Sequence, residues 1–180
     1  MTKNHSLESK LGKWLQAIFL AGGIVLFIRF FILIPINVTG DSMSPTLKPD
    51  TYVVYEPLSA VKHFDIVLFH DNHGESYIKR VVGLPGDSIT YRDDHLYINE
   101  VVVEEPYLEP LRHSDQVLTP DFTLQAVTGL TTIPEDSYFV LGDNRPRSQD
   151  SRMFGFVPID AIDGKIRLII YPFDELATLP

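Results

Sequence analysis

The sequence contains no cysteine among its 180 residues. This absence excludes a disulfide framework, a thiolate metal site and a cysteine nucleophile. Basic side chains are also scarce, with 15 Lys and Arg against 24 Asp and Glu, which gives a formal net charge of −9. A general nucleic-acid binder needs a basic surface, so the charge argues against that class and we expect no nucleic-acid partner. The G-x-S-x-G, H-E-x-x-H, P-loop and G-x-G-x-x-G motifs are missing as well.

What the sequence does contain is enough apolar material for an ordered core, at 44% hydrophobic and 22% charged residues. The length favours one domain with a small appendage. The charge is divided unevenly, because residues 1–35 carry +3 and residues 36–180 carry −12. A basic, apolar head therefore precedes an acidic body.

The head contains a long apolar run from Trp14 to Ile34, which is 21 residues long and has Arg29 as its one charge. A helix rises about 1.5 Å per residue, so this run reaches about 30 Å, the thickness of a bilayer core. Arg29 lies close enough to the far end to extend toward the headgroups. We expect residues 14–35 to form a transmembrane anchor that ends at Pro35, which cannot continue a helix.

Three lysines precede the apolar run, and the positive-inside rule then keeps residues 1–13 in the cytoplasm. Residues 36–180 would lie on the outer face of the cell membrane. The alternative is a cleaved secretory signal, although the apolar stretch is longer than the roughly 7–15 residues of such signals. A small-residue cleavage site is also poorly represented at Val38-Thr39-Gly40.

The body is predicted to be mainly β, with an antiparallel arrangement of short apolar runs separated by turn residues. Residues 92–94 are expected to close a hairpin between Ile89–Tyr91 and Leu96–Ile98. Only Pro158–Asp163 is predicted to be helical, for about one turn. Residues 104–136 hold four prolines and scattered acids, which indicates a loop-rich excursion. The predicted strands are Thr51–Glu56, Asp65–His70, Ser76–Gly83, Ser88–Arg92, His95–Asn99, Ser137–Gly142 and Lys165–Tyr171.

Three polar segments could carry chemistry, and each alone is also typical of ordinary surface structure. They are GDSMSPTL from Gly40, YIKRVVGLPGD from Tyr77 and GDNRPRSQDSRMFG from Gly142. In the second segment, the two-residue period of a strand puts Lys79 on one face with Tyr77 and Val81. Such a lysine could be a simple edge-strand charge, or its pKa could be lowered by several units through burial against apolar walls.

A lowered lysine pKa would have a chemical use here. A serine hydroxyl is a weak nucleophile at neutral pH and needs a base within hydrogen-bonding reach. A lysine can be this base only when it is neutral. A decrease of about two pKa units costs about 2.7 kcal/mol of free energy. A fold can tolerate this cost if Lys79 lies between Tyr77, Val81 and the Met43 region.

In this order behind one apolar span, the three segments resemble the bacterial type I signal peptidases, also called leader peptidases. The resemblance runs from the apolar span to Phe173, and the Gly-Asp pair before Ser42 resembles the Gram-positive branch. It implies a membrane-anchored serine endopeptidase that removes signal peptides from exported preproteins, with the membrane and the export machinery as further partners. It requires no metal and no cofactor.

The resemblance also implies roles for individual residues. Ser42 matches the acylating nucleophile and Lys79 its general base. Ser148 matches the hydroxyl that orients the lysine amine. Asp150 and Arg152 match an ion pair that positions their loop.

The oxyanion site is less well defined by the resemblance. The Ser42 backbone N–H would supply one donor. Many Gram-negative members supply the second donor from a serine hydroxyl two residues earlier, where this chain has Gly40, so a backbone N–H or another side chain must replace it. The third segment also departs from the commoner family form at Pro146 and Arg147, for which we expect a changed loop shape with activity kept.

The substrate implied by the resemblance is an extended peptide with small side chains at the first and third residues before the cut. Shallow rigid pockets reject larger side chains, at a cost of about 1–3 kcal/mol. By position, the residues that resemble the lining of the two pockets are Ile36, Val38, Met43, Leu47, Tyr77 and Ile78.

Two other functions remain open from the sequence. A non-catalytic relative could bind peptides or act as an assembly chaperone, although such a protein would be expected to lose the serine or the lysine. A LexA-like self-cleaving protein would keep the pair, but the chain shows no DNA-binding module and the apolar span would have no role.

Overall fold

The computed structural model describes residues 12–23, 34–57, 60–71, 73–112 and 116–179. The chain divides into two compact units, Met1–Ile34 and Pro35–Pro180. In the first unit, residues 12–23 form a helix whose apolar side chains are exposed, Trp14 among them. Within the described ranges, no helix combines the length and the apolar character that a bilayer crossing requires. Residues 24–33 of the predicted anchor lie outside the described residues.

The end of the predicted anchor is corrected by the first strand, β1 (Ile34–Asn37). Residues 34 and 35 were expected to end a helix, but they begin this strand instead. A proline is tolerated there because β1 is the edge strand of its sheet, where a missing N–H costs no ladder hydrogen bond.

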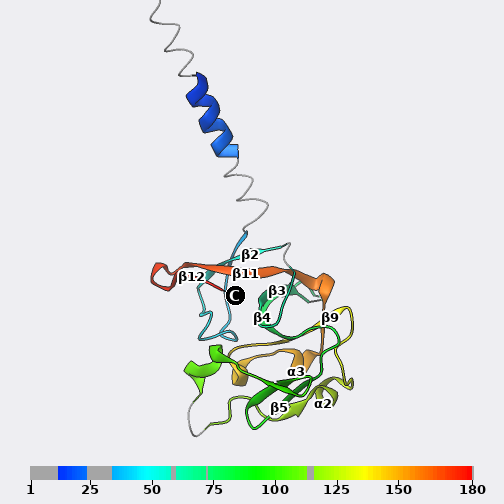
Figure 1. Ribbon diagram of the computed structural model, residues 1–180. Coiled ribbons are helices and arrows are strands. Elements are labelled where there is room, and N and C mark those ends of the chain that lie inside the picture. The colour runs from blue at the N-terminus through cyan, green and yellow to red at the C-terminus, as the bar shows by residue number, and fades with distance from the viewer. Residues whose placement is uncertain (1–11, 24–33, 58–59, 72, 113–115, 180) are drawn as a thin grey trace, which may run out of the picture. The chain divides into compact units, whose positions relative to one another are not determined.

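The second unit is built on a large sheet with the strand order β1-β2-β11-β3-β4-β9-β10, and β12 pairs with β11. The pairs from β2 through β10 are antiparallel. The long strand β11 pairs with both β2 and β3 through register shifts, so it joins two parts of the sheet (Figure 1). The remaining strands of this sheet are β2 (Tyr52–Glu56), β3 (Ile66–His70), β4 (Ser76–Gly83), β9 (Ser137–Leu141), β10 (Val157–Pro158), β11 (Ile162–Tyr171) and β12 (Ala177–Thr178).

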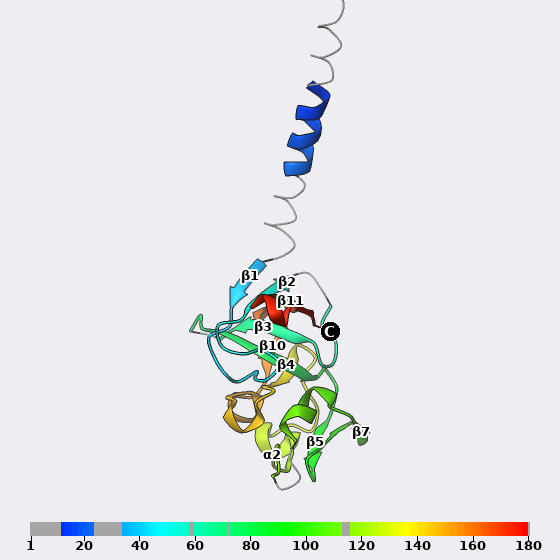
Figure 2. The same ribbon diagram turned by 90° about the vertical axis from the view of Figure 1, so that its left-hand side faces the viewer.

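A smaller sheet has the order β7-β6-β5-β8 and lies at the end of this unit away from β2 and β11 (Figures 1 and 2). Its strands are β5 (Ile89–Arg92), β6 (His95–Ile98), β7 (Val101–Val103) and β8 (Phe122–Thr123). The predicted hairpin is confirmed, since Ile89 pairs with Ile98 and Tyr91 with Leu96. Asp93 and Asp94 have φ values of 50° and 62°, as a two-residue hairpin turn requires.

Helical segments of the described part of the second unit are short. The helical turn predicted within Pro158–Asp163 is present as the 3-10 turn Ile159–Ala161, before β11 begins at Ile162. The expectation that this would be the only helical segment of the body was wrong. The unpredicted α2 (Leu124–Thr128) begins with a Thr123 side-chain cap and ends at Gly129 with φ of 81°, and α3 (Ser151–Phe154) begins with an Asp150 side-chain cap. The other 3-10 turns are Pro106–Leu111, Arg145–Arg147 and Phe173–Glu175.

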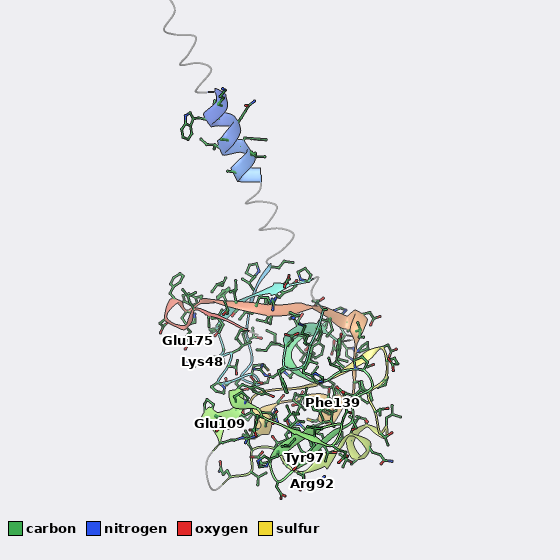
Figure 3. All side chains as sticks on the ribbon, viewed as in Figure 1. Lys48, Arg92, Tyr97, Glu109, Phe139 and Glu175 are labelled. Atoms are coloured by element: carbon green, nitrogen blue, oxygen red, sulfur yellow. The ribbon has the colours of Figure 1, made fainter. Side chains whose placement is uncertain are left out.

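Among the residues that the structure describes, buried side chains form three apolar clusters. One joins the two sheets around Leu141 and Phe139, of which Phe139 is labelled in Figure 3. A second holds Val38, Met43 and Leu47 against the large sheet, and so fixes the segment that follows β1. The third packs strands β3, β4 and β9 on their other face. The expectation of a mainly antiparallel β fold is confirmed for this unit.

Candidate active site

Ser42 lies in a turn that is anchored at both ends. Before it, the Val38 N–H donates to the Thr51 carbonyl at 2.8 Å. After it, the side chains of Met43 and Leu47 are 1% and 0% exposed, and the Leu47 N–H donates to the Met43 carbonyl at 2.9 Å. Burial of these two apolar side chains therefore holds the turn on the sheet while Ser42 itself remains partly accessible.

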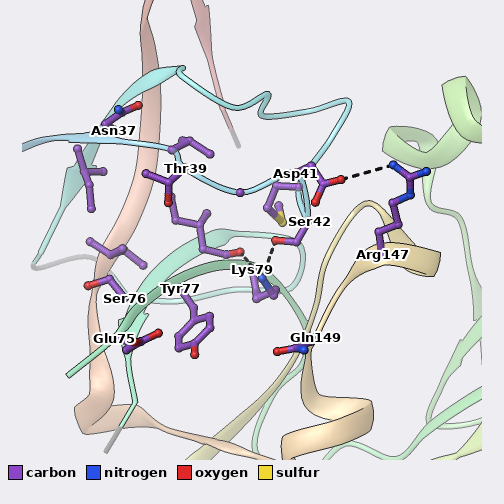
Figure 4. Close-up of a pocket in the computed structure, with 16 residues that line it drawn as sticks. Asn37, Thr39, Asp41, Ser42, Glu75, Ser76, Tyr77, Lys79, Arg147 and Gln149 are labelled. Carbon is purple, nitrogen blue, oxygen red and sulfur yellow. Dashed lines mark hydrogen bonds and ion pairs between the residues drawn. The ribbon is translucent and has the colours of Figure 1, made fainter. Parts of the chain in front are cut away.

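Lys79 reaches this serine from the middle of β4, where it pairs with Val67 of β3. Its Nζ donates to Ser42 Oγ at 2.7 Å and to the Ile78 carbonyl at 3.1 Å (Figure 4). The residue is only 3% exposed. The two partners are 37 positions apart in the chain, so only the fold brings them together.

Burial lowers the pKa of Lys79, because desolvation disfavours the charged amine. The carboxylates of Asp150 and Asp143 act in the opposite direction and favour the charged form. Tyr77 provides an aromatic wall whose ring centroid lies 5.9 Å from Nζ, and this ring stacks on Phe69. The amine is thus adjacent to apolar surface and makes a hydrogen bond to an alcohol, which is the environment that a lysine base needs.

Ser148 lies beside the nucleophile segment but does not bond the lysine. Its Oγ is buried and has no hydrogen-bond partner among the described residues. A Cβ added to Gly142 would meet Ser148 Oγ at 2.2 Å and the Ser42 carbonyl oxygen at 2.5 Å. The absence of a side chain at Gly142 therefore allows the segments that carry Ser42 and Ser148, the two serine segments, to approach closely. The role of Ser148 in orienting the amine stays a prediction.

Asp150 and Arg152 form a bidentate pair, with Arg152 Nε at 2.8 Å and Nη2 at 2.7 Å from the carboxylate oxygens. Asp150 also accepts the Gly142 N–H at 3.1 Å, and Arg152 Nη2 donates to the Arg145 carbonyl at 2.7 Å. The pair therefore connects the start, the middle and the end of the loop that follows β9.

Two buried arginines near the site were not predicted from the sequence. Arg80, next to Lys79 on β4, binds Asp143 through Nε at 2.8 Å and Nη2 at 2.6 Å. Arg145 is fully buried and donates to Glu105, which accepts a further hydrogen bond from Tyr91 Oη at 2.7 Å. For Arg80, the signal in the sequence was a charged residue inside a strand that is buried on both faces. For Arg145, no local pattern points to Glu105 as its partner.

A cleft of about 550 Å³ runs along the serine and lysine segments (Figure 4), within the range of about 300–1,000 Å³ that is typical of ligand sites. Of the predicted site residues, the cleft is lined by Ile36, Val38, Gly40, Ser42, Met43, Tyr77, Ile78 and Lys79. Leu47 was also expected there, but it is fully buried in the core beneath the turn and does not line the cleft. Asp41, Arg147 and Gln149 line it instead, although no role was predicted for them.

The oxyanion site is open on the Gly40 side, since a Cβ at Gly40 would meet nothing within 4 Å. The Ser42 backbone N–H donates to no group within the described ranges. A second donor at the Gly40 position is not identified by these contacts. Among the residues that the structure describes, no group of three or more His, Cys, Asp or Glu side chains is placed to hold a metal ion.

A partly accessible serine hydroxyl bonded to a buried lysine amine, at the wall of an elongated cleft, is the arrangement that a serine hydrolase with a lysine base would need. Comparison with known proteins makes the assignment specific. Residues 11–171 match the family described as signal peptidase, peptidase S26, and the chain belongs to this family.

Individual relatives agree with the family match. The chain is 44% identical to signal peptidase I of Bacillus caldolyticus, with 98% of each chain covered. It is 35% identical to signal peptidase IB of Staphylococcus aureus, with 94% of each chain covered. A crystal structure of a signal peptidase I from Enterococcus faecalis V583 matches with a TM-score of 0.57 and 45% identity, over 59% of this chain and 97% of that one. The resemblance to the Gram-positive branch is therefore confirmed.

Proposed function

We propose that this chain is a serine endopeptidase that removes N-terminal signal peptides from exported preproteins, with Ser42 as nucleophile and Lys79 as general base. The observation that carries the proposal is the hydrogen bond of 2.7 Å between Ser42 Oγ and a Lys79 amine whose pKa is lowered by burial. The family match and the relatives of nearly equal length support the same activity.

The reaction begins when the neutral Lys79 amine takes the proton of Ser42 Oγ as this oxygen attacks the scissile carbonyl. The negative charge that develops on the carbonyl oxygen is stabilised by the Ser42 N–H, which has no other acceptor within the described ranges. The Lys79 ammonium then gives its proton to the leaving amine, which releases the mature protein. A water molecule, deprotonated by the same amine, hydrolyses the acyl-enzyme.

Ser148, Asp150 and Arg152 act on the position of these groups. The Asp150–Arg152 pair fixes the loop that carries Ser148. Ser148 Oγ is buried beside the Ser42 segment without a partner among the described residues. A small shift of this hydroxyl toward the amine would satisfy it and orient the base.

The substrate enters as an extended strand along the cleft. Ile36 and Val38 form one wall, and Tyr77 and Ile78 form the other. Because Val38 and Met43 are almost fully buried, their positions are fixed by the core. Rigid walls of this kind accept small side chains at the first and third positions before the cut and exclude larger ones.

The apolar run that begins at Trp14 serves as a single membrane anchor, with residues 1–13 in the cytoplasm and 36–180 outside. The 21-residue length of the run and the lysines before it support this topology. An anchor confines the cleft to the membrane surface, where signal-peptide ends emerge from the export machinery, and so raises their effective concentration. Membrane lipid is the expected second partner.

The test is mass spectrometry of a model preprotein after incubation with the full-length chain in detergent. Cleavage after a small-x-small site is expected, and Ser42→Ala and Lys79→Ala should each abolish it. Ser44→Ala and Lys62→Ala are matched controls, since neither residue lines the cleft, and both should cleave at the wild-type rate. Wild-type processing by either Ser42→Ala or Lys79→Ala would falsify the assignment of these two residues as nucleophile and base. Capture of the signal peptide without cutting would favour a peptide-binding protein instead.

A further inference from the structure

An exposed ion pair crosses one end of the cleft. Asp41 directly precedes Ser42, and Arg147 directly precedes Ser148. Asp41 Oδ2 and Arg147 Nη1 are 3.7 Å apart, and the two side chains are 52% and 76% exposed (Figure 4). Both residues line the same cleft as Ser42. Arg147 therefore lines the same cleft as Ser42 without being part of the Ser42–Lys79 dyad.

The order of the residues along the cleft places this ion pair relative to the substrate. Figure 4 shows Asn37, Glu75 and Ser76 at one end, the dyad further along, and Arg147 at the other end beyond Ser42. This step rests on the proposed function, in which the signal-peptide residues lie along 36–38 and 76–78. Residues after the cut must then leave past Ser42, toward Asp41 and Arg147.

The Arg147 guanidinium has donors to spare. Its Nη1 faces Asp41, whereas its Nε and Nη2 make no hydrogen bond or ion pair within the described part of the chain. A guanidinium offers five N–H donors in a planar fork, so a carboxylate can bind its second edge in bidentate fashion while Asp41 keeps the first. The main chain of Asp41 is held by Asn144 Nδ2, which donates to its carbonyl at 3.1 Å.

The two ends of the cleft also differ in charge. Glu75 is exposed at the end where the signal peptide is placed, and Arg147 contributes a positive charge at the end where the mature chain leaves. Asp41 and Arg147 together carry no net charge, but an exposed pair at this separation is weak. A carboxylate among the first residues of the mature protein can therefore bind the free edge of the guanidinium or compete with Asp41 for it.

We propose that Arg147 is a specificity-determining residue that favours preproteins with an acidic side chain at the first or second position after the cleavage site. An extended chain advances about 3.3 Å per residue, and the ion pair involves the residue next to Ser42, so these positions are the ones within reach. The contact is exposed, so its effect is modest and decreases as salt concentration rises.

The experiment compares preproteins that differ only at the second mature residue, which is Glu, Gln or Lys. For the full-length chain in detergent at low salt, kcat/KM should be about two- to fivefold higher for Glu than for Lys, and the ratio should approach one at high salt. Arg147→Gln should remove the preference, and Arg147→Glu should reverse it. Asp41→Asn should enlarge it, because the competing carboxylate is lost.

The matched control is Arg92→Glu, which makes the same change in net charge on an exposed arginine of β5, far from the β11 end of the domain (Figure 3). It should keep the wild-type ratio. The proposal is overturned if Arg147→Glu leaves the ratio of kcat/KM for the Glu and Lys preproteins unchanged, or if Arg92→Glu changes this ratio equally.

A binding measurement separates this inference from the proposed function. Fluorescence anisotropy with the uncleaved peptides is measured on the Ser42→Ala variant, with and without Arg147→Glu. Affinity for the Glu peptide should fall relative to the Lys peptide when Arg147 is reversed, and an unchanged ratio refutes the role of Arg147. Absence of cleavage by the wild-type chain would instead contradict the peptidase assignment and leave this binding result decisive.

Discussion

The close approach of the two serine segments at Gly142 leads to a specific prediction for Gly142→Ala. The added methyl would lie 2.2 Å from Ser148 Oγ, 2.5 Å from Ser148 Cβ and 2.5 Å from the Ser42 carbonyl oxygen. That carbonyl already accepts the Asn144 N–H at 2.9 Å, and Gly142 itself is bound through its N–H to Asp150. Since none of these atoms is the free end of a long side chain, the loop has to move.

The magnitude follows from overpacking and from the loss of alignment. Extra atoms in a well-packed site cost about 1–3 kcal/mol of stability, and for a chain of this size each kcal/mol lowers Tm by about 2–4 °C. A displacement approaching 1 Å in the positioning of reacting groups costs on the order of 100-fold in rate. We therefore expect kcat/KM to fall by a factor of about 10–100, well beyond what the loss of folded protein explains.

The assay is preprotein cleavage at a temperature below the Tm of every variant, with thermal unfolding measured in parallel. Gly83→Ala is the matched control on β4, because its methyl would meet Ile133 Cδ1 at 2.3 Å, in the core and outside the cleft lining. It should lower Tm while kcat/KM remains near wild type. Wild-type kcat/KM in Gly142→Ala would refute the view that the spacing of these two segments controls catalysis.

Three further variants test the electrostatics of the site. Lys79→Met should be inactive but more stable than wild type at pH 7, because the lowered pKa of Lys79 means that the charged amine is less stable in the native state than in the unfolded chain. The gain in the free energy of unfolding, measured in urea, should shrink as pH rises toward the ordinary lysine pKa, and a gain that is constant with pH would contradict this. Asp150→Asn removes a carboxylate that favours the charged form of the Lys79 amine. The rising limb of the pH profile of kcat/KM should therefore move to lower pH. A move to higher pH would show that Asp150 does not raise the pKa of Lys79. Arg145→Met should cost about 3–5 kcal/mol in urea unfolding because it removes the nearest charge partner of the buried Glu105 and leaves only Arg112 at 4.0 Å among the ion pairs of the described residues. Adding Glu105→Gln should recover part of this loss, and strict additivity of the two substitutions would show that residues 105 and 145 do not interact.

The strands of the body could be predicted from the sequence because their signal is local. Ser76–Gly83 and the hairpin around Asp93 and Asp94 occur as expected, since alternating apolar residues and turn residues specify them within a few positions. The first two residues of β1 were assigned to the anchor instead, because an apolar strand that follows an apolar run shows no change of composition at its start. The short helix α3 was missed because its main signal is one capping side chain, Asp150.

The site was predictable where three motifs carry a family resemblance, and less so where contacts are long-range. The sequence can suggest Ser42 and Lys79, but not that their atoms meet. Leu47 was placed in a pocket because it lies in the nucleophile motif, yet the turn directs it into the core. The buried contact of Arg145 with Glu105 joins residues 40 positions apart, and each was part of a segment predicted to be a loop.

If Lys79 acts as a neutral base for Ser42, the pH dependence of kcat/KM must follow the titration of its amine. We expect kcat/KM for a fixed preprotein to rise with a single pKa below the ordinary lysine value, and this rise to move to lower pH in Asp150→Asn. A kcat/KM that rises only near the ordinary pKa of lysine, or that does not change across the alkaline range, would show that Lys79 is not a neutral base for Ser42.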